Sequence, residues 1–124
     1  MHGTKIYVAV VDDDLSVCKA LARLLQANEF EAETFESASA FLASLSVRTP
    51  ECLILDFHMP NCSGLDLSRQ LKRKSIDIPR VLVTAHNEPG LEEQASLAGA
   101  SAVLSKPLTK EVLIDAINRA TAGC

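Results

Sequence analysis

The sequence has little of several features that mark particular classes of protein. It contains no tryptophan, and aromatic residues make up only 4% of it, so a core has to be built from Leu, Val, Ile and Ala. The longest apolar run, Ile6 to Val11, is far shorter than the roughly 20 residues of a membrane-spanning helix. Residues Met1 to Lys5 lack the apolar segment of a signal peptide. These absences argue against a membrane protein or a secreted one.

An excess of basic residues is absent as well. The formal net charge is −4, whereas a domain that binds nucleic acid by itself usually carries a basic patch. We interpret the short cluster Lys72-Arg73-Lys74 as a solvated helix end. The sequence therefore predicts no direct binding of nucleic acid.

The four cysteines form no C-x-x-C pair. Cys18 and Cys52 lie in apolar patterns, and Cys62 and Cys124 are isolated. The simplest interpretation is free thiols in a reducing compartment, which predicts a cytoplasmic protein without a membrane partner.

The length and composition are those of one globular domain. The chain has 124 residues, of which 48% are apolar and 23% charged. No repeat or linker divides it, so we expect a single domain over 1–124, with its core at about 5–121, and no DNA-binding domain within the chain.

Short apolar runs alternate with amphipathic stretches. The runs are nearly continuous, as expected for strands covered by helices on both faces. The predicted strands are Ile6–Val11, Glu31–Phe35, Cys52–Leu55, Val81–Val83 and Ala102–Leu104. The segments between and after them carry apolar residues at helical spacing. In this pattern Leu67 lies near the rim of the third predicted helix, and Val112 belongs to the apolar stripe of the last one. Thr109 is the predicted N-cap of that last helix, and Gly99 is the predicted end of the fourth. This order predicts an α/β fold, a doubly wound five-stranded parallel sheet of the flavodoxin-like (βα)5 type with strand order 2-1-3-4-5.

Polar residues follow these strands at the edge where such sheets bind ligands. Asp12 and Asp13 come after the first strand and Asp56 after the third. The fourth strand ends in Thr84, and the fifth leads to Lys106. Because the first and third strands are predicted neighbours, the three carboxylates should converge, with Thr84 and Lys106 beside them.

Converging carboxylates repel one another unless a cation neutralises them, and Mg²⁺ prefers such oxygen ligands. A carboxylate beside this ion can attack phosphorus and form an aspartyl phosphate, with Lys106 and Thr84 binding the phosphoryl oxygens. Each residue also has a simpler reading taken alone. The acidic run could cap a helix, Asp56 could cap a turn, and Thr84 and Lys106 could be ordinary strand-end and loop residues.

Four motifs resemble those of bacterial two-component response-regulator receiver domains. They are V-V-D-D-D at 10–14, L-I-L-D-F-H-M-P at 53–60 with Gly64, V-L-V-T-A at 81–85, and L-S-K-P at 104–107. The resemblance covers about Ile6 to Ala120, and residues 35–42 look most like FixJ-type receivers of the LuxR-like transcription factors.

The resemblance implies a role for each matching residue. Asp56 would be the phosphoacceptor, and Thr84 and Lys106 would contact the phosphoryl group. Asp13 would bind Mg²⁺ directly, Asp12 partly through water, and Asp56 and the backbone carbonyl of His58 would complete the metal site. The Lys106–Pro107 peptide would be cis.

The implied function is a phosphorylation-dependent switch that assists its own phosphotransfer and dephosphorylation and is not otherwise an enzyme. The implied partners are a sensor histidine kinase, a second copy bound through the fourth helix, fifth strand and fifth helix, and a DNA-binding output domain or partner outside this chain.

Two positions depart from the family pattern. Val103 stands where receivers usually carry an aromatic residue that moves inward on activation, which puts the usual switching route in question. His58 and His86 stand at positions that affect loss of the phosphoryl group in the family; the alternative is two exposed loop histidines.

Three other functions compete with this one. A flavodoxin-like cofactor binder needs a Gly-, Ser- or Thr-rich phosphate loop, but Asp12-Asp13-Asp14 occupies that place. A phosphatase with an aspartyl nucleophile usually has a second carboxylate where His58 stands. A phosphorylation-independent interaction module would not need all five phosphotransfer residues.

Overall fold

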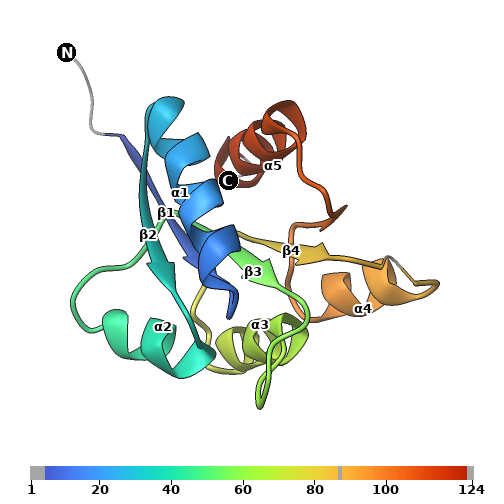
Figure 1. Ribbon diagram of the computed structural model, residues 1–124. Coiled ribbons are helices and arrows are strands. Elements are labelled where there is room, and N and C mark those ends of the chain that lie inside the picture. The colour runs from blue at the N-terminus through green and yellow to red at the C-terminus, as the bar shows by residue number, and fades with distance from the viewer. Residues whose placement is uncertain (1–4, 87, 123–124) are drawn as a thin grey trace.

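The computed structural model describes residues 5–86 and 88–122, and in this part strands and helices alternate along the chain. Figure 1 shows the elements, which are β1 (Ile6–Val11), α1 (Leu15–Ala27), β2 (Phe30–Phe35), α2 (Ala38–Ser44), β3 (Cys52–Asp56), α3 (Gly64–Arg73), β4 (Arg80–Thr84), α4 (Leu91–Leu97), β5 (Ala102–Ser105) and α5 (Lys110–Ala122). The strands form one parallel sheet in the order β2-β1-β3-β4-β5. The predicted fold and strand order are confirmed.

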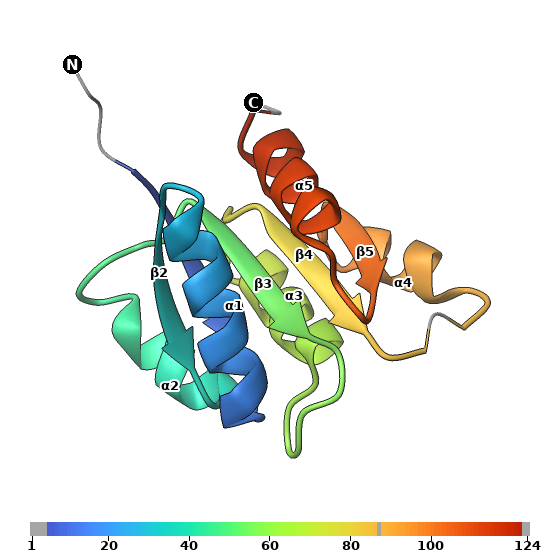
Figure 2. The ribbon, with the colours of Figure 1, turned by 45° about the horizontal axis from the view of Figure 1, so that its top comes forward.

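Helices cover both faces of the sheet. Figure 2 shows α1 and α5 on one face, where they bury the strand residues Val8, Val10, Ile54, Val81 and Val83. The helices α2, α3 and α4 cover the other face. The middle residues of β1, β3 and β4 are apolar because helices cover these strands on both faces, and the polar residues Asp56, Arg80 and Thr84 stand at strand ends.

Local side chains set the ends of several helices. Asp14 caps α1, and Ser63 forms a capping box with Asp66 at the start of α3. The predicted cap of the last helix is confirmed, since the Thr109 hydroxyl accepts a hydrogen bond from Val112 N–H at 3.2 Å. Gly99, at φ +92°, ends the turn after α4 in the left-handed region, also as predicted.

Two burial predictions were wrong. Leu67, expected near the rim of its helix, is fully buried, and Val112, expected in the buried stripe of the last helix, is 46% exposed. Leu113, Ala116 and Ile117 alone carry the deep contacts of α5 with the sheet. The spacing of apolar residues predicts the helix, but the angle at which the helix lies on the sheet decides which of them are covered.

Cys18, Cys52 and Cys62 are free thiols, and Cys124 lies outside the described residues, as do Met1 to Thr4. Across residues 5–86 and 88–122, no helix has the length and apolar character needed to cross a membrane.

Candidate functional site

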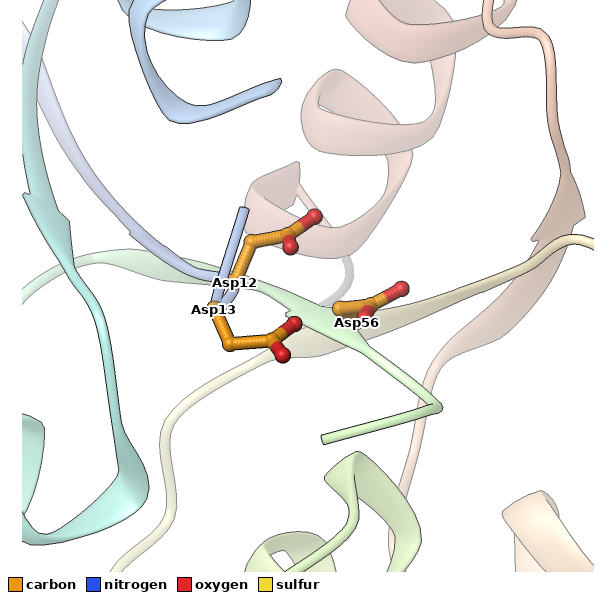
Figure 3. A group of neighbouring side chains, drawn as sticks. All are labelled: Asp12, Asp13 and Asp56. Carbon is orange, nitrogen blue, oxygen red and sulfur yellow. The ribbon is translucent and has the colours of Figure 1, made fainter. Parts of the chain in front are cut away.

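Three carboxylates meet at the carboxyl edge of the sheet. In the parallel pairing of β1 with β3, Val11 lies opposite Leu55, so Asp12 and Asp56 follow at the same level. Asp13 is next along the chain. Figure 3 shows the three side chains side by side at the ends of β1 and β3. Ligand oxygens of Asp12, Asp13 and Asp56 all lie within 4.8 Å of one another. The predicted convergence is confirmed.

The three carboxylates differ in exposure. Asp12 and Asp56 are buried, at 3% and 6% relative exposure, whereas Asp13 faces solvent. Burial raises the pKa of Asp12, and the charge of Asp56 raises it further, while the Asp14 N–H and the charge of Lys106 act in the opposite direction. A site with this much uncompensated negative charge is suited to a divalent cation.

Lys106 supplies the one positive side chain that contacts the carboxylates within the described residues. Its Nζ lies 3.0 Å from Asp56 Oδ1 and 3.6 Å from Asp12 Oδ2. Burial lowers the pKa of Lys106, but the hydrogen bond to Asp56 and the two negative charges outweigh this and raise it. The lysine therefore stays charged beside the site.

The backbone around Lys106 holds it in place. Its N–H donates to the Thr84 carbonyl at 2.8 Å, which ties the β5–α5 loop to the end of β4. The Lys106–Pro107 peptide is cis, which confirms the expectation drawn from the family resemblance.

Thr84 is fully buried, and its hydroxyl is bonded to the loop that follows β4. It donates to the His86 carbonyl at 2.9 Å and accepts from the His86 N–H at 3.2 Å. To donate to a group on Asp56, this hydroxyl would have to give up its hydrogen bond to the His86 carbonyl.

Comparison with known proteins fits this geometry. Residues 8–118 match the family model of the response regulator receiver domain. The chain belongs to this family. Receiver domains are signalling domains of two-component response regulators, and as a family they bind Mg²⁺ at an acidic pocket.

Several known proteins are similar to nearly the whole of this chain. Nodulation protein W of Bradyrhizobium diazoefficiens is 37% identical over 96% of this chain and 52% of its own length. The transcriptional regulatory protein FixJ of Rhizobium meliloti is 37% identical over 95% of this chain and 58% of its own. The chain thus spans about half the length of these relatives.

Solved structures of response regulators are similar to this chain in both fold and sequence. The crystal structure of FixJ-N has a TM-score of 0.88 and 35% identity, covering 100% of this chain and 98% of that one. The response regulator StyR has a TM-score of 0.82 and 43% identity, covering 95% of this chain and 60% of that one. The predicted family, with its likeness to FixJ-type receivers, is confirmed.

Gly64 lets α3 of this receiver begin against the end of β3. A Cβ at this position would overlap the backbone carbonyl oxygen of Asp56, and the Gly64 N–H donates to the Phe57 carbonyl at 3.1 Å. The glycine that follows D-x-x-M-P in the sequence is therefore required by close backbone approach.

The two histidines near the site of this receiver are both exposed. The His58 ring packs edge-on against Phe57, with centroids 4.8 Å apart. Their exposure is consistent with two ordinary loop histidines. An effect of either side chain on the loss of a phosphoryl group stays a prediction. The role of the His58 carbonyl as a metal ligand also stays a prediction.

Sequence reasoning missed an apolar cavity beside the acidic site of this receiver. It has a volume of about 460 Å³ and runs from Asp12, Asp56 and Lys106 between α1 and the sheet to Pro107 and Leu108. Its α1 wall is made by Val17, Ala20 and Leu21. Apolar residues on such a helix face are normally expected to pack in the core, and sequence alone carries no signal that α1 leaves space beside the β5–α5 loop.

Proposed function

We propose that this receiver takes a phosphoryl group from a sensor histidine kinase onto Asp56 and relays the signal by a change of conformation. The observation that carries the proposal is the buried Asp56 carboxylate, set beside two further acidic side chains and held at 3.0 Å by Lys106 Nζ. Neither a helix cap nor a strand-end residue needs this arrangement.

We infer that Asp12, Asp13, Asp56 and the His58 backbone carbonyl would hold the Mg²⁺ that receivers use. The donors are hard oxygens, and Lys106 balances only one of three negative charges, so the site suits a divalent cation. When bound, the ion would neutralise charge on the phosphoryl oxygens.

The chain's own residues would carry the transfer. An Asp56 carboxylate oxygen forms a bond to phosphorus as the bond from phosphorus to the donor imidazole nitrogen breaks, and the electron pair of that bond stays on the nitrogen. Lys106 stays paired with the new phosphate, and the Thr84 hydroxyl leaves His86 to donate to a phosphoryl oxygen. In the later hydrolysis, water oxygen bonds to phosphorus as the bond from phosphorus to the Asp56 oxygen breaks, which frees inorganic phosphate and restores the carboxylate. The receiver in this way assists its own dephosphorylation rather than turning over external substrates.

The partners outside the chain remain part of the proposal. We infer one receiver domain over 1–124, with its core at 5–121, which acts in the cytoplasm. It would pass the signal to a DNA-binding output domain or partner, and would not itself bind nucleic acid or membrane. The printed names of FixJ and of NtrC, a DNA-binding transcriptional regulator that is 34% identical, support an output of this kind. A homodimer would form through α4, β5 and α5.

Asp13→Asn is expected to weaken Mg²⁺ binding by about tenfold or more, since even the loss of an outer-shell partner weakens a metal site by this much. A titration followed by amide shifts of residues 12–14 and 56–58 measures it. Asp14→Asn is the matched control because it removes a neighbouring carboxylate and Asn caps α1 as well as Asp does. Equal affinities in the two variants would contradict the ligand assignment.

Val103→Phe is expected to extend the conformational change that phosphorylation causes beyond residues 84–90 and to tighten dimerisation. Val103 lines a cavity of about 300 Å³ between α4 and β5, together with Ala95 and Ala100. Valine is short and β-branched, so it cannot swing a ring into this space as the switch moves. Without the ring, we expect beryllium fluoride, a phosphoryl mimic, to shift amides mainly at 84–90 and to drive only weak dimerisation.

Amide shifts and sedimentation with and without the mimic compare the two forms. Large shifts through β5 and α5 together with a tight dimer in the unmodified chain would show that this receiver switches fully without the aromatic.

A further inference from the structure

A buried guanidinium holds the C-terminal end of α4. Arg80, the first residue of β4, is 3% exposed. Its Nε donates to Ser68 Oγ at 2.6 Å, and its Nη1 to the Ile78 carbonyl at 2.9 Å. Its Nη2 donates to the carbonyls of Ser68 and Ala98, both at 3.1 Å. One side chain thus joins β4, α3 and the last turn of α4.

This charge is buried without a carboxylate. All four acceptors are neutral oxygens, and within residues 5–86 and 88–122 no ion pair joins Arg80 to an acidic side chain. Burial lowers the pKa of Arg80, with the charge of Asp77 opposing it. An apolar side chain would fill the start of a buried strand with less desolvation, so the position calls for an explanation beyond packing.

Two side chains of α3 add to the same anchor. Ser68 Oγ donates to the Ala98 carbonyl at 2.8 Å, and Lys72 Nζ donates to the Leu97 carbonyl at 2.7 Å. Carbonyls in the last turn of a helix have no partner within it, so these donors satisfy groups that α4 leaves open. A Cβ on Gly99 would overlap Arg80 Nη2, so another residue there would displace the guanidinium.

The other end of α4 is held differently. Gly90 precedes the helix at φ +86° and offers no side-chain cap, and residues 85, 86, 88 and 89 are exposed. The hydrogen bonds of His86 to the Thr84 hydroxyl lie in this stretch, while Asn87 is outside the described residues. The N-terminal side of α4 is therefore tied to the side chain that a phosphoryl group would recruit.

We propose that Arg80 is a positioning residue which, with Ser68 and Lys72, makes the fixed pivot of α4. When Thr84 leaves His86, the loop and the N-terminal end of α4 move, while Leu97 and Ala98 stay bonded to α3. The surface that reports phosphorylation is then the N-terminal part of α4. This inference rests on the proposed phosphorylation of Asp56 and its recruitment of Thr84.

The test compares amide shifts caused by beryllium fluoride with Mg²⁺ at 97–101 and at 88–92. In the unmodified chain the shifts at 97–101 should be several-fold smaller. Arg80→Lys keeps the charge but loses the planar fork of the guanidinium. In this variant and in Lys72→Met, the ratio of the shifts at 97–101 to the shifts at 88–92 should rise several-fold. Lys74→Met, a change at another exposed lysine at the end of α3, should leave it unchanged. Lys72→Met keeps the test decisive if Arg80→Lys does not fold.

A purely structural role would lower the melting temperature of the variants without changing this ratio, and that result would overturn the pivot. Shifts as large at 97–101 as at 88–92 in the unmodified chain would overturn it too. If beryllium fluoride shifts no amides at Asp13, Asp56 and Thr84, the proposed function itself fails. If it shifts those amides saturably, but the shifts along α4 are equal at both of its ends, only the pivot is rejected.

Discussion

Asp56→Asn is expected to abolish the phosphoryl adduct that the unmodified chain gains on incubation with acetyl phosphate and Mg²⁺. Among the described residues, Asp56 is the buried carboxylate at the end of β3 that Lys106 contacts most closely, at 3.0 Å. Asparagine keeps the shape of the side chain but offers no carboxylate oxygen to attack phosphorus. Intact mass should show one adduct in the unmodified chain and none in the variant.

Asp77→Asn is the control for this experiment because it removes an exposed carboxylate away from the acidic site. It should gain the adduct as the unmodified chain does. The Asp56→Asn variant should also stay folded, since it removes one of three mutually repelling charges. An acid-labile adduct of undiminished yield in a folded Asp56→Asn variant would refute the assignment.

Lys106→Ala is expected to keep the fold and to lose most of the conformational response. Its ammonium contacts the carboxylate that would carry the phosphoryl group, and a hydrogen bond to a charged group contributes about 2 kcal/mol. Removing it should cut the bias toward the active state by roughly 30-fold. Full switching from 1:99 to 99:1 needs about 5.5 kcal/mol, so this loss is decisive.

The response is read from amide shifts at Thr84 and residues 88–92 on adding beryllium fluoride. The Lys106 N–H to Thr84 carbonyl bond survives truncation of the side chain, so the β5–α5 loop should remain in place. Lys110→Ala, which truncates an exposed lysine on α5, is the matched control. A large fall in melting temperature with Mg²⁺ present would show that Lys106 is structural, and an unchanged response would show that it is dispensable.

Much of the fold follows from local pattern. The apolar runs β1, β3 and β4 are recognisable because strands covered on both faces have no polar alternation. Alternation of strands with amphipathic segments leaves few parallel arrangements, and the observed order is the one expected. The predicted ends of the strands were less accurate. The strand β4 begins at Arg80 and ends at Thr84, whereas the apolar run covered only Val81–Val83.

The convergence of Asp12, Asp13 and Asp56 was predictable for a related reason. Each lies at the end of a strand or within two residues of it, and parallel neighbours end at one edge of the sheet, so positions along the chain translate into proximity. The position of Lys106 beside these carboxylates was predictable in the same way, because it follows the end of β5 at the same edge of the sheet.

By itself, the sequence determined the fold class, the strand order and the identity of the residues at the acidic edge, because these depend on periodicity and on the order of elements. Only the tertiary structure decided that the Thr84 hydroxyl is bonded to His86, that Arg80 reaches Ala98 across 18 positions, and that a cavity opens beside Lys106. These features depend on which rotamer fits between neighbours from different elements and on how closely two helices lie on the sheet. Neither quantity has a local pattern, since the partners are far apart in the chain and meet only when the core has packed.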